Sequence, residues 1–330
     1  MVELPALPAR IDKVLFYADG AKSSEGEMRN GRREGRWILY YADGKRRAIG
    51  GYKNYAPDGD WLYFHPGIET AMRQGRFVDG KEEGAWTRWH PTGTKIEFGE
   101  FRAGLREGPW NEWYPGGKLK NQGAYHSGRK EGVWTIFHED GVTKNQEGLY
   151  RRDMRDGPWV FWHANAKKFQ EGGYALGIAM GKWTVWHDNG QKQSEGLYDV
   201  GGQTGHWTKW YADGQKEFEG AWEAGKEQGA WTRWHENGRV KAQGSYDQGR
   251  MFGDWTSYYA NGQKEAVSVY SAAGQLNGPY RSWFDNAQRK SEGNYVLGKM
   301  EGPWKFWQPD GTPNEDLTGE YANDHRKKEQ

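Results

Sequence analysis

The chain has 330 residues, 35% of them hydrophobic, and includes 20 Trp, 19 Tyr, 12 Phe and 49 Gly. Aliphatic residues are too scarce for a thick core, so aromatic rings must supply most of the buried apolar area. Lys plus Arg number 46 and Asp plus Glu number 45, so the net charge of +1 provides no long-range field for nucleic acid. The absence of Cys excludes disulfides, thiolate metal sites and a cysteine nucleophile.

The first twelve residues read as an N-terminal cap segment. They contain Pro5 and Pro8, which discourage the addition of a further strand at that end. No apolar run flanked by basic residues follows, and no stretch is long enough to span a membrane. We therefore expect a cytoplasmic protein, although a chain trimmed of a leader would look the same.

Beyond this segment the chain is built from one repeated unit. The seven residues GAWTRWH occur at 84–90 and again at 229–235. The first aromatic residue of this motif, which we call the marker aromatic, recurs at spacings of 24 or 25 residues. The marker aromatics are Trp37, Trp61, Trp86, Trp110, Trp134, Trp159, Trp183, Trp207, Trp231, Trp255, Tyr280 and Trp304. A period of this length indicates a repeat architecture.

Each unit reads as a β-hairpin. A second aromatic follows three residues after the marker, then His or Tyr, then a turn such as Asn237-Gly238. A polar run next leads to a strand glycine and a closing aromatic, as in Gly244 and Tyr246. Asn-Gly between aromatic-rich runs favours a tight hairpin turn with positive φ. We expect strands of about five residues, with the strand glycine leaving room for a neighbouring ring.

These hairpins predict an all-β fold. Stacked edge to edge, they form an elongated single-layer antiparallel sheet of about twelve hairpins, because one hairpin alone cannot bury its apolar side chains. The array is expected over residues 13–322, followed by a frayed polar tail at 323–330. Several units depart from the pattern: Ala166 and Ala287 replace the turn glycine, and Ser268 replaces the strand glycine.

The pattern G-x-W-x-x-W/Y-x-x-N/D-G, followed by G-x-Y-x-x-G, resembles the MORN repeat, and most of all a bacterial variant associated with the antitoxin of toxin pairs. The pairs that define the repeat best are Trp86 and Trp89, Trp110 and Trp113, Trp183 and Trp186, and Trp231 and Trp234. The resemblance implies a non-enzymatic scaffold that dimerises or binds other proteins, with phospholipids as a further proposed ligand. The antitoxin variant implies neutralisation of a toxin.

Six His residues share the position after the second aromatic: His65, His90, His138, His163, His187 and His235. Equivalent residues of neighbouring hairpins lie about 10 Å apart, whereas zinc needs each nitrogen at about 2 Å. Tyr fills the same position in other units, as at Tyr41 and Tyr114. We therefore expect these side chains to pack, with no metal site and no cofactor.

The residues just before each marker motif vary most and offer a candidate contact surface. Early units are charged there, whereas several later units are apolar. The candidate partner-binding residues are Ile178, Met180, Met251, Phe252, Leu276 and Met300. Met suits adaptable binding surfaces, and exposed apolar residues in turns indicate a protein partner or a homodimer contact. The alternative is local packing under a twisted turn.

No catalytic motif is present: the chain contains no GxxxxGK[ST], HExxH or GxSxG. The sequence therefore favours a non-enzymatic scaffold that binds a protein partner, such as a toxin, an effector or a scaffold client. One alternative is carbohydrate or lipid-surface binding through an exposed aromatic row. The other is a structural element that assembles with itself.

Overall fold

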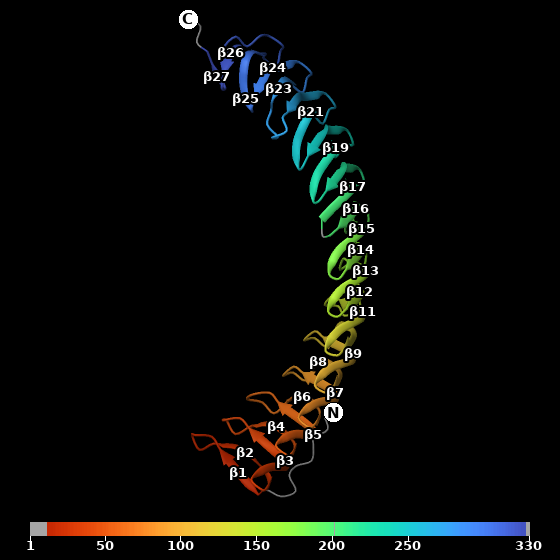
Figure 1. Cartoon of the computed structure of the whole chain (residues 1–330), viewed down its shortest axis with the longest axis vertical. Coiled ribbons are helices and arrows are strands. Elements are labelled where there is room, and N and C mark those ends of the chain that lie inside the picture. Colours follow the sequence, from red (N-terminus) through yellow and green to blue (C-terminus); the bar gives the residue numbers. More distant parts are fainter. Residues whose placement is uncertain (1–11, 201, 328–330) are drawn as a thin grey trace. The chain divides into compact units, whose positions relative to one another are not determined.

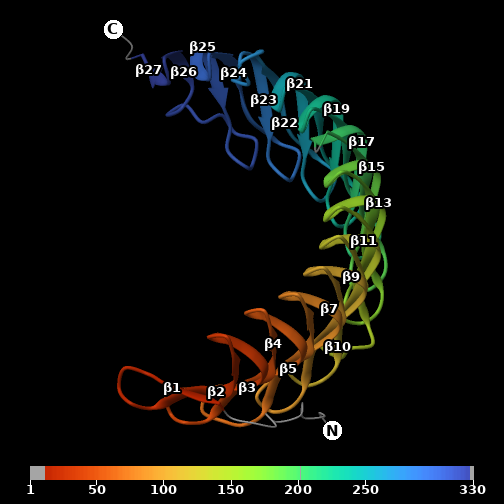
Figure 2. The same cartoon turned by 60° about the horizontal axis from the view of Figure 1, so that its bottom comes forward.

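The computed structural model describes residues 12–200 and 202–327, and these residues form β-strands joined by turns. The chain divides into two compact units, residues 1–166 and 167–330, and we describe each by itself. In both units consecutive strands pair antiparallel, so the all-β hairpin array expected from the sequence is confirmed (Figures 1 and 2).

Unit 1 contains thirteen strands among its described residues. They are β1 (Lys13–Phe16), β2 (Lys22–Arg29), β3 (Arg32–Tyr40), β4 (Arg46–Lys53), β5 (Ala56–Phe64), β6 (Ala71–Val78), β7 (Lys81–Trp89), β8 (Lys95–Arg102), β9 (Leu105–Trp113), β10 (Leu119–His126), β11 (Arg129–Phe137), β12 (Lys144–Arg151) and β13 (Met154–Trp162).

Unit 2 contains fourteen strands in its described part. They are β14 (Lys168–Ala175), β15 (Ile178–Trp186), β16 (Lys192–Asp199), β17 (Gly202–Trp210), β18 (Lys216–Glu223), β19 (Lys226–Trp234), β20 (Val240–Asp247), β21 (Arg250–Tyr258), β22 (Lys264–Tyr270), β23 (Gly278–Trp283), β24 (Arg289–Val296), β25 (Lys299–Phe306), β26 (Gly319–Ala322) and β27 (His325–Arg326).

The two turns of each repeat differ from the expected assignment. In the Asn-Gly turn only the glycine has positive φ (78° at Gly238), and the His235 amide pairs with the Arg239 carbonyl at 2.9 Å. The tight two-residue turns lie at the other end of the hairpin, where both residues have positive φ, as at Ala224 and Gly225. That geometry matches the right-handed twist of the flanking strands.

The strands are longer than the five residues expected, because most of them run for eight or nine. The long strand contains a bulge at the glycine two residues before the marker, which we call the bulge glycine. At Gly229 φ is 67°, and the register with β18 slips between Gly220 and Ala221. A bulge lets the strand continue through an extra residue and increases its local twist. The residues before the bulge glycine therefore belong to strands, not to turns.

The two ends of the predicted array were expected to be a cap segment and a frayed tail. The predicted cap at residues 1–12 lies almost entirely outside the described residues. At the other end, residues expected to form a frayed tail instead make a tight turn and the short strand β27, which pairs with β26. Asn323 and Asp324 both adopt positive φ there, and the Asp324 amide donates to the Met300 carbonyl. The tail is ordered here because this turn occupies the same place in the repeat as the earlier two-residue turns.

Candidate functional site

The marker aromatics form the buried side of each unit, which we call the Trp face. A Cβ added at the strand glycine of one repeat would come within 2.6 Å of the next marker indole, for example 2.2 Å between Gly244 and Trp255. The indole therefore lies against bare backbone, as expected from the sequence. Its Nε1 also donates to a carbonyl ten residues earlier, as from Trp255 to Ser245 at 2.9 Å.

Marker and closing aromatics alternate along this face in edge-to-face contacts. We call this series the aromatic ladder. In unit 1 it runs without interruption through Trp37, Tyr52, Trp61, Phe77, Trp86, Phe101, Trp110, Tyr125, Trp134, Tyr150 and Trp159. Such pairs are favoured at centroid distances of about 4.5–7 Å. The ladder takes the place of an aliphatic core.

The repeat-defining aromatics consequently fall into two classes. The marker residues Trp86, Trp110, Trp183 and Trp231 are buried in the ladder. The second aromatics of the same repeats are half-buried on the opposite face of the sheet: Trp89, Trp113, Trp186 and Trp234. There a lysine covers two of these four rings: Lys168 lies over Trp186 at 5.5 Å and Lys216 over Trp234 at 5.4 Å. Lys216 also pairs with Glu219 at 2.6 Å. The buried marker row offers no open rings for stacking a sugar or a lipid headgroup.

The His row has a structural role in the described residues. The Nε2 atoms of His187 and His235 lie 3.0 Å and 2.8 Å from backbone carbonyls one repeat later. The hydroxyl groups of Tyr211 and Tyr259 reach the equivalent carbonyls at 2.9 Å. His and Tyr interchange because each can donate a hydrogen bond across the same gap. In residues 12–200 and 202–327, no cluster of three His, Cys, Asp or Glu side chains could hold a metal ion.

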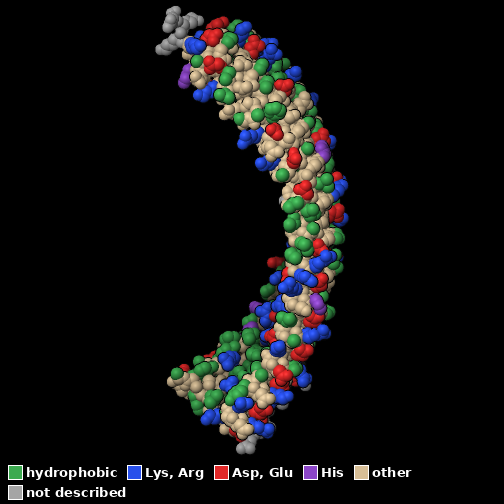
Figure 3. Space-filling model, in the orientation of Figure 1, with side chains coloured by type: hydrophobic (Ala, Val, Ile, Leu, Met, Phe, Trp, Pro, Cys, Tyr) green, Lys and Arg blue, Asp and Glu red, His purple; other side chains and the backbone are tan. Residues whose placement is uncertain are grey.

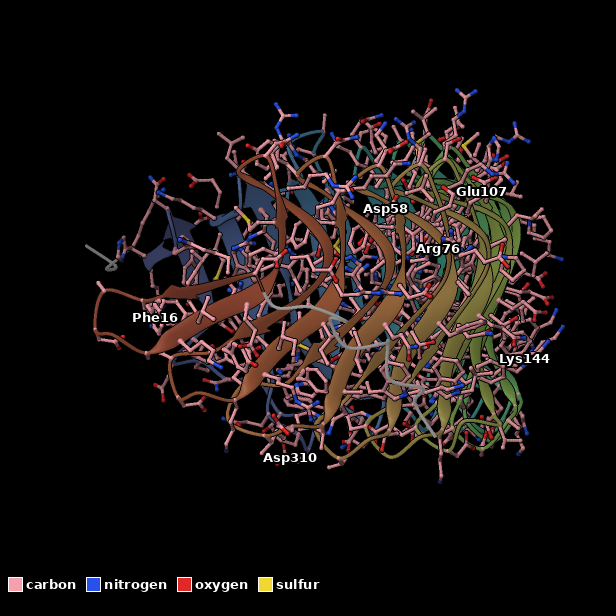
Figure 4. The ribbon with its side chains drawn as sticks, turned by 90° about the horizontal axis from the view of Figure 1, so that it is seen from below. Phe16, Asp58, Arg76, Glu107, Lys144 and Asp310 are labelled. Carbon is pink, nitrogen blue, oxygen red and sulfur yellow. The ribbon has the colours of Figure 1, made fainter. Side chains whose placement is uncertain are left out.

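The residue before each bulge glycine caps the next two-residue turn, and we call it the turn-capping position. The Glu83 carboxylate accepts the Ala103 amide at 2.8 Å, and Glu107 accepts the Ser127 amide at 2.8 Å. This hydrogen bond is the largest cause that lowers the pKa of Glu107. Figure 4 labels Asp58 and Glu107, both at this position, on one edge of unit 1, with Lys144 toward the other.

Two of the candidate partner-binding residues occupy turn-capping positions. Met180 is half-buried, and its sulfur lies 3.0 Å from the Val200 amide. Phe252 is 46% exposed and cannot accept a hydrogen bond. Unit 2 has thus replaced carboxylates by apolar side chains at two places where unit 1 has Glu or Asp.

Three more candidates share the position before that one. In four repeats of unit 1 this position carries a cation that lies over the marker ring, such as Arg106 over Trp110 at 4.4 Å and Lys130 over Trp134 at 4.4 Å. Met251, Leu276 and Met300 hold it in unit 2, and all three are half-buried. They lie on the Trp face or in the loop beside it, so their side chains are packed rather than presented by turns.

The remaining candidate, Ile178, begins β15 and belongs to an exposed cluster that the sequence pattern did not single out. The exposed fractions are 45% for Ile178, 56% for Leu176, 43% for Leu197 and 82% for Val200. We call these four residues, with Met180 between the two turns, the apolar turn patch. Leu176 is the first residue of a two-residue turn, and Val200 holds the equivalent position one repeat later with a positive φ of 36°. This position could be recognised only once the two-residue turns were located. Charged and hydrophobic side chains are interspersed along the face of unit 2 in Figure 3.

Four segments of the chain match the MORN repeat variant: residues 33–54, 106–126, 181–199 and 227–248. Each begins two to four residues before a marker Trp and ends just after a closing aromatic. These four segments are similar to MORN repeats, and together they cover less than half of the chain. Two of the matched MORN repeats lie in unit 1 and two in unit 2, and the MORN repeat at 181–199 carries Leu197 of the apolar turn patch.

No curated protein matches the chain significantly. Among solved structures, the crystal structure of TcdB2-TccC3-Cdc42 is 11% identical with a TM-score of 0.18, over 91% of this chain and 17% of that one. The Photorhabdus luminescens Tc holotoxin pore is 12% identical with a TM-score of 0.19, over 91% of this chain and 18% of that one. This chain therefore spans less than a fifth of those chains. TM-scores this low do not support a shared fold or function.

The part of the chain that the structure describes contains no helix with the length and apolar character needed to cross a membrane.

Proposed function

We propose that this MORN-repeat chain is a non-enzymatic scaffold that binds a protein partner, and that the apolar turn patch of unit 2 makes the central contact. The observation that carries this proposal is the exposure of Leu176, Ile178, Leu197 and Val200, two of them outside the strands and two within β15 and β16. Clusters of exposed apolar side chains mark interaction sites more reliably than single ones.

The surroundings of the patch support the same conclusion. The Met180 sulfur is a weak acceptor for the Val200 amide, whereas Glu83 and Glu107 offer carboxylates to equivalent amides. Stability alone would favour the carboxylate, because it forms a stronger hydrogen bond. An apolar side chain retained there is accounted for by contact with another molecule, and the flexible thioether adapts well to a partner surface.

A toxin or effector that the chain neutralises is one candidate partner, and a second copy of the chain is another. Neither is distinguished by the chemistry of the patch. The carbohydrate or lipid alternative receives less support, because one aromatic row is buried and lysines lie over several rings of the other.

The proposal is tested by affinity purification of the tagged chain from its native cell, followed by mass spectrometry. The test variant is Ile178→Lys with Val200→Gln, which introduces the residues that Lys226 and Gln248 place at the same repeat positions. The matched control is Leu105→Lys with Leu297→Gln, which makes the same changes at equivalent exposed positions elsewhere.

We expect one protein to co-elute near stoichiometrically with the parent chain and the control. Its recovery should fall at least about tenfold with the test variant, because truncating central apolar contacts typically costs 2 kcal/mol or more. Equal recovery with all three chains would place the contact elsewhere. Recovery of the chain alone would assign a second copy as the partner, and recovery of glycans or lipid without a dominant protein would contradict a dedicated protein partner.

A further inference from the structure

Among the described residues of unit 2, ring contacts of the aromatic ladder are missing between Trp207 and Trp222 and again around Tyr270. Trp231, Tyr246 and Trp255 follow one another at 5.5 Å and 5.0 Å, and the ladder resumes from Tyr280 to Tyr295 at 5.3 Å. Tyr270 holds the closing position between Trp255 and Tyr280. Within the described residues, it contacts neither ring at ladder distance.

Two substitutions cause this break. Ser268 stands where the other repeats have the strand glycine, and Tyr280 stands where they have a marker Trp. In the preceding repeat a Cβ at Gly244 would lie 2.2 Å from the Trp255 ring, so a side chain at this position excludes an indole in the usual place. Tyr280, whose ring is smaller than an indole, therefore accompanies the side chain at Ser268.

The sheet is also opened at this point. β22 and β23 pair only through Ala266 with Ser282 and Val267 with Arg281, whereas β21 and β22 pair at six positions. A longer connection follows β22 in place of the two-residue turn, held by an isolated bridge between Tyr270 and Leu276. The pairing of backbone strands is therefore short where the ring contacts of Tyr270 are missing.

A cavity of about 340 Å³ lies at this break. This volume falls at the lower end of the roughly 300–1,000 Å³ of small-molecule pockets. Rings line it from Trp255, Tyr270 and Tyr280, and Met251, Leu276 and the buried Ser268 complete the wall. One carboxylate and one ammonium also line it, from Glu265 and Lys290, so the cavity has no net charge that favours an ion.

We propose that this cavity binds a neutral planar aromatic group with a hydrogen-bonding edge, such as an indole or a phenol. The repeats of unit 1 show what such a space holds, because there an indole such as Trp134 lies between two rings in edge-to-face contact. The three rings that line the cavity can provide the same edge-to-face partners for a bound ring. Met251 adds a sulfur–aromatic contact, and the Ser268 hydroxyl offers a hydrogen bond to the edge of the ring.

The group can come from a free small molecule or from an aromatic side chain of a bound protein, and the test separates these sources. Saturation-transfer NMR on the full chain uses three probes: indole, N-acetyl-tryptophanamide and cyclohexanol. Indole and N-acetyl-tryptophanamide share the ring, but only the second carries a flanking backbone. Cyclohexanol carries a hydroxyl without an aromatic ring.

The test variant combines Ser268→Gly with Tyr280→Trp, which restores the pair present in the other repeats and fills the cavity. The control is Tyr295→Trp, a closing position outside the cavity wall where Trp222 shows that the repeat accepts Trp. Circular dichroism and thermal unfolding confirm that both variants are folded.

We expect indole to bind the parent chain and the control, at least about tenfold more weakly to the test variant, and cyclohexanol to show no saturable binding. Binding of N-acetyl-tryptophanamide as well would assign a side chain as the source, and its failure would assign a free aromatic molecule. The proposal is overturned if indole does not bind, if cyclohexanol binds equally well, or if the folded test variant binds indole like the parent chain.

Discussion

The indole of Trp134 lies directly against the backbone of Gly123, so closely that a Cβ at residue 123 would come within 2.2 Å of the ring. The same indole donates from Nε1 to the Ala124 carbonyl at 3.0 Å. One glycine and one Trp thus join two successive hairpins by packing and by a hydrogen bond. This relationship recurs through both units, as at Gly148 and Trp159 and at Gly220 and Trp231.

Gly123→Ala should destabilise the chain strongly. The added methyl group overlaps the Trp134 ring and neighbouring rings prevent its retreat, so we expect a loss of about 2–3 kcal/mol. Urea unfolding measures this. Gly116→Ala is the control, because a Cβ there meets nothing within 4 Å. Its effect should stay within about 0.5 kcal/mol. Equal losses of unfolding free energy in the two variants would contradict specific packing of the indole against Gly123.

The His and Tyr of the row after the second aromatic should be interchangeable. His187→Tyr keeps a donor for the Trp210 carbonyl, so its stability should remain within about 0.5 kcal/mol of the parent. His187→Phe keeps the ring but loses the donor, and it should cost about 1 kcal/mol. Thermal unfolding of both variants checks this. A larger loss in the Tyr variant than in the Phe variant would show that shape, not the hydrogen bond, governs the position.

The turn-capping position needs an acceptor rather than a charge. Glu83→Ala removes the acceptor for the Ala103 amide and should cost about 1 kcal/mol. Glu83→Gln should stay within about 0.5 kcal/mol, because Gln228 already accepts the Gln248 amide at 2.9 Å in its own repeat. Denaturant unfolding of the two variants shows whether the position needs a hydrogen-bond acceptor or a negative charge. Similar losses would mean that the charge itself matters.

Alkaline pH should unfold the chain through tyrosines that pack among the buried rings. Burial raises the pKa of Tyr63 from 10.0 to about 12, and burial also raises the pKa of Tyr125 and Tyr246. The unfolded chain releases these protons first, so their stabilising contribution is complete below pH 10 and is lost as pH rises from about 10 to about 12. Circular dichroism alongside tyrosinate absorbance follows this.

Tyr63→Phe supplies the control for that titration. It keeps the ring beside Trp61 but removes one ionisable group, so stability should fall less steeply over the same pH interval. If the slope is unchanged, the other tyrosines carry the whole effect.

Ala287→Gly should stabilise the chain. Ala287 holds φ of 68° in a turn where other repeats have glycine, and a left-handed conformation costs a residue with a Cβ about 1–2 kcal/mol. Part of this gain is offset by the entropy of glycine in the unfolded chain, leaving about 0.5–1 kcal/mol. Thermal unfolding tests it. A lower melting temperature would indicate that the Ala287 methyl group makes a contact that outweighs the strain.

Much of the site could not be found from the repeat pattern. Ile178 was singled out as apolar, but Leu176 and Val200 were not, because they matter only as neighbours on consecutive turns. Met251 and Met300 were expected in turns and lie instead in strands, since the bulge glycine lets the strand continue through it. The cavity at Ser268 and Tyr280 was visible only as two departures from the pattern.

The sequence by itself determined the period, the hairpins and the space that the strand glycines leave for a neighbouring ring, because these features repeat in phase along the chain. The tertiary structure decided which turn is tight, how deeply the marker rings are buried and which carbonyl His187 reaches. Those outcomes depend on strands brought together through space, where register, bulges and neighbouring rings act jointly. Local sequence preferences do not set such contacts, and the placement of the apolar turn patch and the cavity follows from them.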